Sequence, residues 1–526
     1  MSESIRPQIV KLTRAEQRRK QRELKEQQKR QGTSYPPTTT LPNRKSGLKT
    51  VREEKMDVKV TTEEKLKVYG QLLPGLLKKL GRIPDPRNPR KTKHRMTVMM
   101  LYGILMFVFQ MTSRRETNRE MTTPQFLEHL QAFFPDLTDM PHQDTLCRLL
   151  EEVDVDSIEN DYIDLLRKLI RKKRFQNLLH NKRYLVAVDG TQKYKMDECW
   201  DERYLRRKIR SKEGGEIEYQ YYAYVLEAVL IFGNGMVLPL KSVFLENTRE
   251  LEAIENDEDW KQDCESKAFH RLAAQLKREF PKLPLTLLLD GLYANGPVME
   301  RCCKNKWQFM IVLKDKSLPS VWKEVKGLMR LDAKHKHAHE RKWQGRKQEF
   351  RWVNEIEYEY GSGKRKVMPI HVVTCKESWE AIDRKTGRKV TKTAEHAWIS
   401  SEPIHEKNVH ARCNLAARKR WLHENNILKE KHQGYRYEHI FSHDWNAMRG
   451  YHYLMHIARM LNEMALHSIS LSNHVKEFGT QSFIKKFREA MICRELDTVR
   501  LRQLAESRSQ LRLVQEEDWK TSQTVA

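Results

Sequence analysis

The sequence has few cysteines, no long apolar run and fewer acidic than basic side chains. Eight cysteines in 526 residues are too few and too scattered for a disulfide framework. The first ten residues, MSESIRPQIV, lack the apolar segment of a secretory signal, so we expect a cytoplasmic, nucleoid-associated protein. The apolar run TVMMLYGILMFVFQM, at 97–111, falls short of the roughly 20 residues that a bilayer requires. We therefore expect it to form a buried helix without membrane contact.

The charge balance identifies the class of partner. The 98 Lys and Arg residues exceed the 71 Asp and Glu residues, which gives a net charge of +27. A polyanion is the natural partner of such a chain, and nucleic acid is the commonest polyanion. An anionic membrane surface is the competing interpretation, and it is disfavoured because the basic stretches have no paired apolar faces.

The N-terminal third divides into a basic arm and a helical segment. Residues 1–60 are rich in Lys, Arg and Gln with a Pro/Thr/Ser stretch, so we expect a disordered arm and linker. Residues 61–180 show apolar spacings of three and four, which predict helices and a DNA-binding domain. Asp144 is expected to begin one of these helices. Two short helices there could form a helix-turn-helix, but the absence of a basic face favours a plain helical bundle.

From residue 181 the pattern changes to strands alternating with helices. Apolar runs at 184–188, 285–289 and 309–313 predict buried strands, and 265–280 predicts a helix between two of them. This order predicts a mixed α/β sheet with both faces covered. We assign 181–324 to the first part of a catalytic domain, 325–408 to a β-rich insertion with a hairpin at Gly-Ser-Gly, 409–475 to completion of that domain, and 476–526 to a polar, partly disordered helical tail.

Two aspartates follow the apolar strands. Asp189 and Asp290 each come at the expected end of a strand and each precede glycine. Carboxylates at the rim of an open α/β sheet lie where such sheets bind ligands, and two of them can hold a hard divalent cation. The plain alternative is a pair of Asp-Gly turns, which is the stronger interpretation for either residue alone.

The stretch ARKRWLHENNILKEKHQGY, at 417–435, predicts a helix that places an acid between two bases. Arg420, Glu424 and Lys431 share one stripe of that helix. A salt bridge between residues four apart explains Arg420 but not Lys431. We expect Trp421 and Leu428 to anchor the stripe to the sheet. Glu424 would then be a third carboxylate of a two-metal site, and the bases would hold phosphates on either side.

Three blocks of the sequence resemble a known family. VAVDGT, LLLDGLYANG and ARKRWLHENNILKEK are similar to the catalytic blocks of DDE transposases from bacterial insertion sequences. The resemblance is to the branch with a β-strand insertion before its glutamate and a Tyr-Arg-Glu-Lys signature. The intervals fit that branch, since 290 − 189 = 101 and 424 − 290 = 134. The signature tyrosine falls at Ala417, which leaves open whether a hairpin intermediate forms.

The resemblance implies a ribonuclease-H-like fold in which Asp189, Asp290 and Glu424 bind Mg²⁺ or Mn²⁺, as two ions. It implies that Arg420 and Lys431 contact DNA phosphates. The implied activity is cleavage and strand transfer on double-stranded DNA, at the element's terminal repeats and at target DNA, by a homodimer. A metal-dependent nuclease without strand transfer and a non-catalytic DNA-binding protein are the alternatives.

Other polar residues have less specific signals. Tyr435 and His439 are candidates either for DNA contact or for the core, about equally. His405, His410 and Cys413 have spacings that a zinc site could use, but no second ligand pair accompanies them. Glu227 lies in the apolar strand YVLEAVLIF, and we expect either a paired acid or a group that supports the site.

Overall fold

The computed structural model describes residues 12–32, 45–210, 217–247, 263–332, 336–383, 385–506 and 510–515. The chain forms two compact units, each made of two separate segments. The first unit contains Met1–Thr39 and Leu287–Arg418, and the second contains Thr40–Thr286 and Lys419–Ala526. The chain is mixed α/β, as expected.

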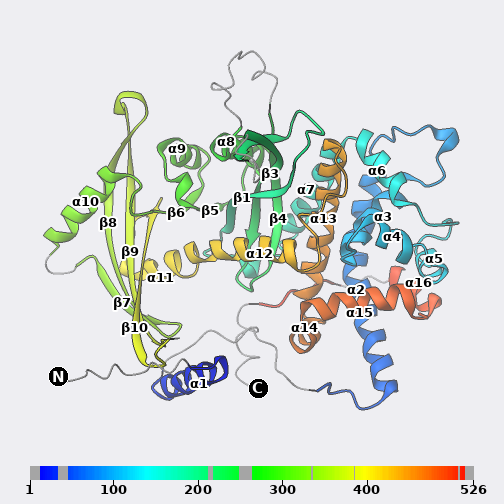
Figure 1. The fold of residues 1–526 in the computed structure, drawn as a ribbon, viewed down its shortest axis with the longest axis horizontal. Helices are drawn as coiled ribbons and strands as arrows, with labels where there is room; N and C mark the ends of the chain where they lie inside the picture. The colour runs from blue at the N-terminus through cyan, green and yellow to red at the C-terminus, as the bar shows by residue number, and fades with distance from the viewer. Residues whose placement is uncertain are drawn as a thin grey trace, which may run out of the picture. The chain divides into compact units, whose positions relative to one another are not determined.

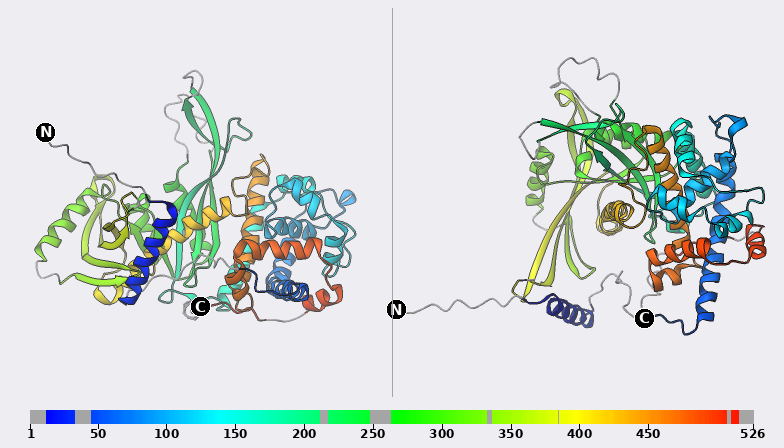
Figure 2. Two further views of the ribbon diagram at one scale, coloured as in Figure 1. Left: turned by 60° about the horizontal axis from the view of Figure 1, so that its bottom comes forward. Right: turned by 45° about the vertical axis from the view of Figure 1, so that its right-hand side comes forward.

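A helical bundle forms one part of the second unit. Its N-terminal helices are α2 (Val51–Leu80), α3 (Met96–Val108), α4 (Arg114–Glu120), α5 (Pro124–Gln131), α6 (Gln143–Glu152) and α7 (Val155–Arg171). Its C-terminal helices are α13 (Trp445–Leu466), α14 (Ser472–Phe478), α15 (Thr480–Cys493) and α16 (Thr498–Glu506). Helix α13 packs against α3, α6 and α7, and its residues are buried around almost the whole circumference (Figures 1 and 2).

The apolar run at 97–111 contributes the buried helix that we predicted. Helix α3 is buried from Met99 to its end because it lies within the bundle beside α2 and α13. Among the described residues, no helix combines the length and the apolar character needed to cross a bilayer. Helix α6 begins at Gln143, one residue before the expected Asp144, because the ring of His142 accepts the Asp144 amide at 3.2 Å.

The segment after residue 480 is part of the core, contrary to the expectation of a polar and partly disordered tail. Helix α15 buries Phe483 and Phe487. The Phe487 ring lies 5.6 Å from the ring of Tyr69 and 5.6 Å from that of Phe109. Helix α15 has only a short apolar pattern in the sequence. It becomes part of the core because its aromatic residues pack against helices that are distant along the chain. Residues 516–526 lie outside the described part of the chain.

A sheet forms the other part of the second unit. Its strands are β1 (Tyr184–Met196), β2 (Leu205–Arg210), β3 (Ile217–Ile231) and β4 (Val237–Leu245). Strand β3 pairs antiparallel with β1 on one side and with β2 and β4 on the other. A turn at Gly233–Asn234–Gly235 joins β3 to β4, with Gly235 at φ +85°. The helix predicted at 265–280 is α8 (Glu265–Glu279), which packs against β3 and β4.

The first unit is built on the antiparallel strands β6 to β10. It contains α1 (Arg14–Arg30), the end of β5 (Leu285–Leu289), α9 (Gly296–Lys304), β6 (Gln308–Val312), α10 (Pro319–Leu331), β7 (Ala338–Trp343), β8 (Arg346–Tyr360), β9 (Lys366–Ile382), β10 (Lys389–Ser400) and α11 (Glu406–Cys413). The strand order is β6, β10, β9, β8, β7. The hairpin predicted around Gly-Ser-Gly is confirmed, since β8 and β9 pair on either side of it (Figure 1).

Helix α1 differs from the disordered arm expected for residues 1–60. Its first turn has a complete capping box between Thr13 and Glu16. It packs on β9 through Leu24 and Gln28, and the Gln28 amide donates to Glu380 at 3.1 Å. Because α1 has few apolar residues, polar contacts contribute part of the interaction that holds it against β9.

One buried carboxylate organises the polar core of the first unit. The side chain of Glu377 on β9 has no exposed surface, and it accepts hydrogen bonds at 2.6 Å from each of Arg346, Gln348 and Arg418. Burial alone would raise the pKa of Glu377, but the surrounding donors and the charge of Arg418 outweigh it and lower the pKa to about 2.

Replacing Glu377 with glutamine should destabilise the first unit by about 3 kcal/mol, because Arg346 and Arg418 lose the carboxylate that compensates them. The stabilisation from Glu377 is complete above its unfolded pKa of 4.5 and disappears as pH falls toward about 2. Urea unfolding followed between pH 7 and pH 3 tests both statements.

The matched control is Glu340→Gln. Glu340 pairs with Lys347 at 2.9 Å, but its side chain is 62% exposed. We expect a change within about 0.5 kcal/mol for this variant. Equal stability of Glu377→Gln and the wild type would show that the buried charge contributes nothing.

Candidate active site

Asp189 lies in the middle of β1, which corrects the prediction that it ends a strand. Strand β1 continues to Met196 because pairing with β3 continues beyond Asp189, whose partner in the register is Glu227. Successive strand residues point to opposite faces of the sheet. The next residue, Gly190, accordingly faces α8, where an added Cβ would lie 2.6 Å from Cδ of Glu265. The glycine therefore serves a close approach to α8 and not a turn.

Helix α12 (Trp421–His432) brings a second carboxylate to the face of the sheet that Asp189 occupies. A short 3-10 turn, Ala417–Arg420, precedes the helix, which packs against β1, β3 and β4. The guanidinium of Arg420 lies 2.6 Å from the Glu424 carboxylate and 3.7 Å from that of Asp189. The Arg420 side chain is 8% exposed, while those of Asp189 and Glu424 are 24% and 31% exposed. The salt bridge expected from spacing is thus present, and it also reaches the sheet.

Several carboxylates lie close together in this cluster, and their mutual repulsion affects the pKa of Asp189. Burial raises the pKa of Asp189 to about 6, Arg420 opposes the rise, and the charges of Glu424 and Glu265 add to it. Glu265 is the first residue of α8 and accepts a hydrogen bond from the Tyr224 hydroxyl. The sequence carries no signal for Glu265, because an acid in the first turn of a helix is ordinary.

Lys431 is held at the end of α12, but the expected anchors are not used. The Lys431 ammonium pairs with Glu438 at 2.9 Å and donates to the Gln192 carbonyl of β1 at 3.2 Å. Trp421 and Leu428 are 58% and 52% exposed, so the prediction that they anchor the helix is wrong. The helix instead buries a largely polar set of residues, His423, Asn426, Ile427 and Glu430.

Asp290 belongs to the first unit. It directly follows β5 and its carboxylate lies 2.8 Å from the Lys314 ammonium. At the neighbouring Gly291, an added Cβ would lie 2.8 Å from the Lys314 side chain, so glycine permits this approach. The Asp-Gly pair here follows a strand, as the sequence predicts.

The two residues after the helix differ in their surroundings. Tyr435 is 8% exposed, and its hydroxyl accepts a hydrogen bond from Asn462 at 2.9 Å. His439 is exposed and its ring lies 4.6 Å from that of Phe441. Tyr435 therefore lies in the core, while His439 is at the surface.

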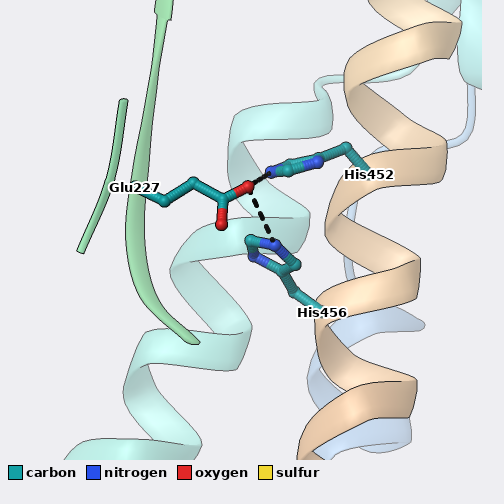
Figure 3. Close-up of side chains that lie close together, drawn as sticks. All are labelled: Glu227, His452 and His456. Atoms are coloured by element: carbon teal, nitrogen blue, oxygen red, sulfur yellow. Dashed lines mark ion pairs between the residues drawn. The ribbon is translucent and has the colours of Figure 1, made fainter. Parts of the chain in front are cut away.

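Beside Asp189, starting from its register partner on β3, lies a buried polar cluster that the sequence did not predict as a group. Glu227 on β3 lies 3.7 Å from Nε2 of His452 and 3.6 Å from Nε2 of His456 (Figure 3). The two histidines are one turn apart on α13. The four-residue spacing of His452 and His456 could have indicated a pair of ligands on one face of the helix. It was not recognised because the apolar residues of α13 dominate the pattern. His405, His410 and Cys413 do not form such a group in the part of the chain that is described.

The same interior holds an ion pair that fixes α12 to α13. Arg459 of α13 contacts the carboxylate of Glu430 and the side-chain oxygen of Asn426, and donates to the Val237 carbonyl at 3.3 Å. The side chains of Arg459 and Glu430 are 2% and 0% exposed. The position of the Glu424 helix thus depends on a buried charge pair.

Comparison with known families gives a match to part of the helical bundle. Residues 77–166 match the model of a family described as DDE_Tnp_1-associated, a domain found in DDE-family transposases. The match supports a DDE transposase. It covers α3 to α6, most of α7 and the end of α2, outside the sheet that carries Asp189. No curated protein matches the chain.

Arg459→Met should reduce stability by about 3–5 kcal/mol, because Glu430 is left charged and unpaired in the interior. The double variant with Glu430→Gln removes both charges and should recover much of the loss. Thermal and urea unfolding of the wild type, both single variants and the double variant form the measurement. Losses that simply add would show that the two residues act independently.

Proposed function

We propose that the protein is an insertion-sequence transposase that binds element ends and catalyses metal-dependent DNA cleavage and strand transfer. The observation that carries the proposal is the bridging of Asp189 and Glu424 by Arg420 on one face of the sheet. It occurs in a chain that also matches a transposase-associated domain.

The two carboxylates have the character of ligands for a hard cation. Both are partly exposed, and the pKa of Asp189 is raised by burial and by the neighbouring acids. A divalent cation would relieve that repulsion, and carboxylate oxygens suit Mg²⁺ or Mn²⁺. Two such ions supply activation of the attacking oxygen and stabilisation of the leaving oxygen. We assign Asp189, Asp290 and Glu424 as the ligands.

The position of each aspartate relative to its strand supports the inclusion of Asp290. The Tyr184 amide donates to the Pro284 carbonyl at 2.9 Å, and Arg183 donates to the Leu285 carbonyl at 2.7 Å. Strands β1 and β5 thus begin side by side, and each aspartate comes five residues after the first residue of its strand. With the antiparallel β1, β3 and β4, this arrangement is compatible with a ribonuclease-H-like fold.

The chain's own residues would bind and orient the DNA. Arg420 is nearly buried between the two acids, and Lys431 is fixed to β1, so both can hold phosphates at a defined place beside the carboxylates. Exposed His439 is a further candidate, whereas buried Tyr435 supports the interior through Asn462.

Other parts of the chain would enlarge the DNA contact. In the first unit, Arg14 and Arg18 of α1 and Lys392 of β10 line a common pocket, which suits a phosphate backbone. We assign the bundle within 61–180 to binding of the terminal repeats. Joining two ends implies a homodimer on the DNA.

Glu424→Gln should reduce both cleavage and joining by at least about 100-fold, because it removes one negative ligand while preserving shape. The assay uses a labelled duplex that carries the terminal sequence of the element encoding this chain, with Mg²⁺. Glu406→Gln, whose side chain is 75% exposed, is the control and should retain full activity.

The products of this assay separate the alternatives. Joined products support a transposase, and cleavage without joining would instead make the protein a nuclease of the same fold. DNA binding without cleavage in the wild type would leave a non-catalytic binding protein. Equal activity of the wild type and Glu424→Gln would show that Glu424 is not a metal ligand and that it only forms the ion pair with Arg420.

A further inference from the structure

Glu227, His452 and His456 form a compact donor set in the interior of the second unit. Their exposed fractions are 1%, 1% and 4%. One ligand atom from each residue lies within 4.8 Å of the other two, and no further group of this kind occurs in the described ranges. Figure 3 shows the two rings projecting from α13 toward the carboxylate on β3.

The separations suit a tetrahedral metal ion. With bonds of about 2.0 Å, ligand atoms around a tetrahedral Zn²⁺ are about 3.3 Å apart. The distances from the Glu227 carboxylate to Nε2 of His452 and of His456 are 3.7 and 3.6 Å. A shift of a few tenths of an ångström would complete the geometry, whereas hydrogen bonds would require a closer approach.

Oε1 of Glu227, the oxygen nearest the two histidines, accepts a hydrogen bond from Tyr437, but the other carboxylate oxygen and one ring nitrogen of the cluster have no partner. Oε2 of Glu227 and Nε2 of His456 are buried and have no hydrogen-bond partner among the described residues. Leaving a buried polar atom unsatisfied costs about 1–3 kcal/mol. Both ring nitrogens of His423 on α12 are buried and unsatisfied in the same way. This concentration of unused donors points to an occupant that accepts their lone pairs.

The remaining contacts orient the donor set as outer groups orient metal ligands. The Tyr437 hydroxyl donates to Oε1 of Glu227 at 2.6 Å, which orients the carboxylate. Ser242 Oγ lies 3.0 Å from Nε2 of His452, and this contact would be replaced by the bond to the metal. Lys193 faces the cluster from β1, 3.5 Å from Nδ1 of His452. Lys193 is the positively charged neighbour that a metal must tolerate, and burial lowers its pKa to about 8.

We propose that Glu227, His452 and His456 bind a transition-metal cation of the Zn²⁺ class, separate from the ions of the catalytic carboxylates. Two imidazole nitrogens and one carboxylate favour such a metal over Mg²⁺, which prefers oxygen ligands. His423 is a candidate for the fourth position. The ion would join β3 to α13, and Glu227 is the register partner of Asp189. The site would therefore fix the strand beside the catalytic aspartate, whether or not the proposed function is correct.

The first test measures zinc binding by the wild-type protein. The full-length chain, freed of metal with a chelator, is dialysed against ZnCl₂ in a large excess of Mg²⁺. We expect about one bound Zn²⁺ per chain and a higher melting temperature. No bound zinc in the folded wild type would overturn the proposal, because excess Mg²⁺ occupies only the oxygen site.

Variants then locate the ion. Glu227→Gln and His456→Gln should lose zinc binding and the zinc-dependent rise in melting temperature, while Tyr437→Phe should weaken binding roughly 10–100-fold. His371→Gln is the control, because His371 is buried at 6% exposure and accepts the Glu355 amide in the first unit. It should bind zinc as the wild type does.

Circular dichroism without metal establishes that each variant is folded. Zinc bound equally by the wild type, Glu227→Gln and His456→Gln would place the ion elsewhere and overturn the proposal. Tyr437→Phe keeps the three ligands, so it tests the site even if a ligand variant does not fold.

Discussion

The second unit depends on the mutual compensation of charges that are withdrawn from water. Arg459 and Glu430 neutralise each other, and Glu227 faces two histidines, all within one interior region beneath α12. Each of these groups would be costly to bury alone. The helix with Glu424 is therefore held by directional polar contacts, which specify its rotation about its own axis more narrowly than apolar packing does.

This constraint explains the surface of α12. Because the inward side of the helix is largely polar, its large apolar residues Trp421 and Leu428 are left at the surface. Arg420 then lies between the two exposed carboxylates and the interior. The order Arg420, Glu424, Lys431 has no evident purpose on an isolated helix. In the structure each base has its own role, since Arg420 contacts Asp189 and Lys431 contacts the backbone of β1.

Much of this could be predicted from the sequence, and the failures have a common cause. The hydrophobic period located the strand runs, the hairpin at Gly-Ser-Gly and the buried helix α3 because these are local patterns. The spacing of Arg420 and Glu424 predicted their contact. Glu265 and the histidines of α13 were missed, because their significance comes from partners that are distant along the chain. The docking of α1 and α15 was missed for the same reason.

The continuation of β1 beyond Asp189 has a consequence for how such a protein can change over time. Backbone pairing on both sides of this residue ties the direction of its carboxylate to the strand register. Inserting one residue upstream in the strand would move Asp189 into the position of Gly190, and would place a carboxylate where only a hydrogen atom fits beside Glu265. A change in the length of this strand would therefore displace the carboxylate, whereas a change in the length of a loop leaves the register of the strand intact.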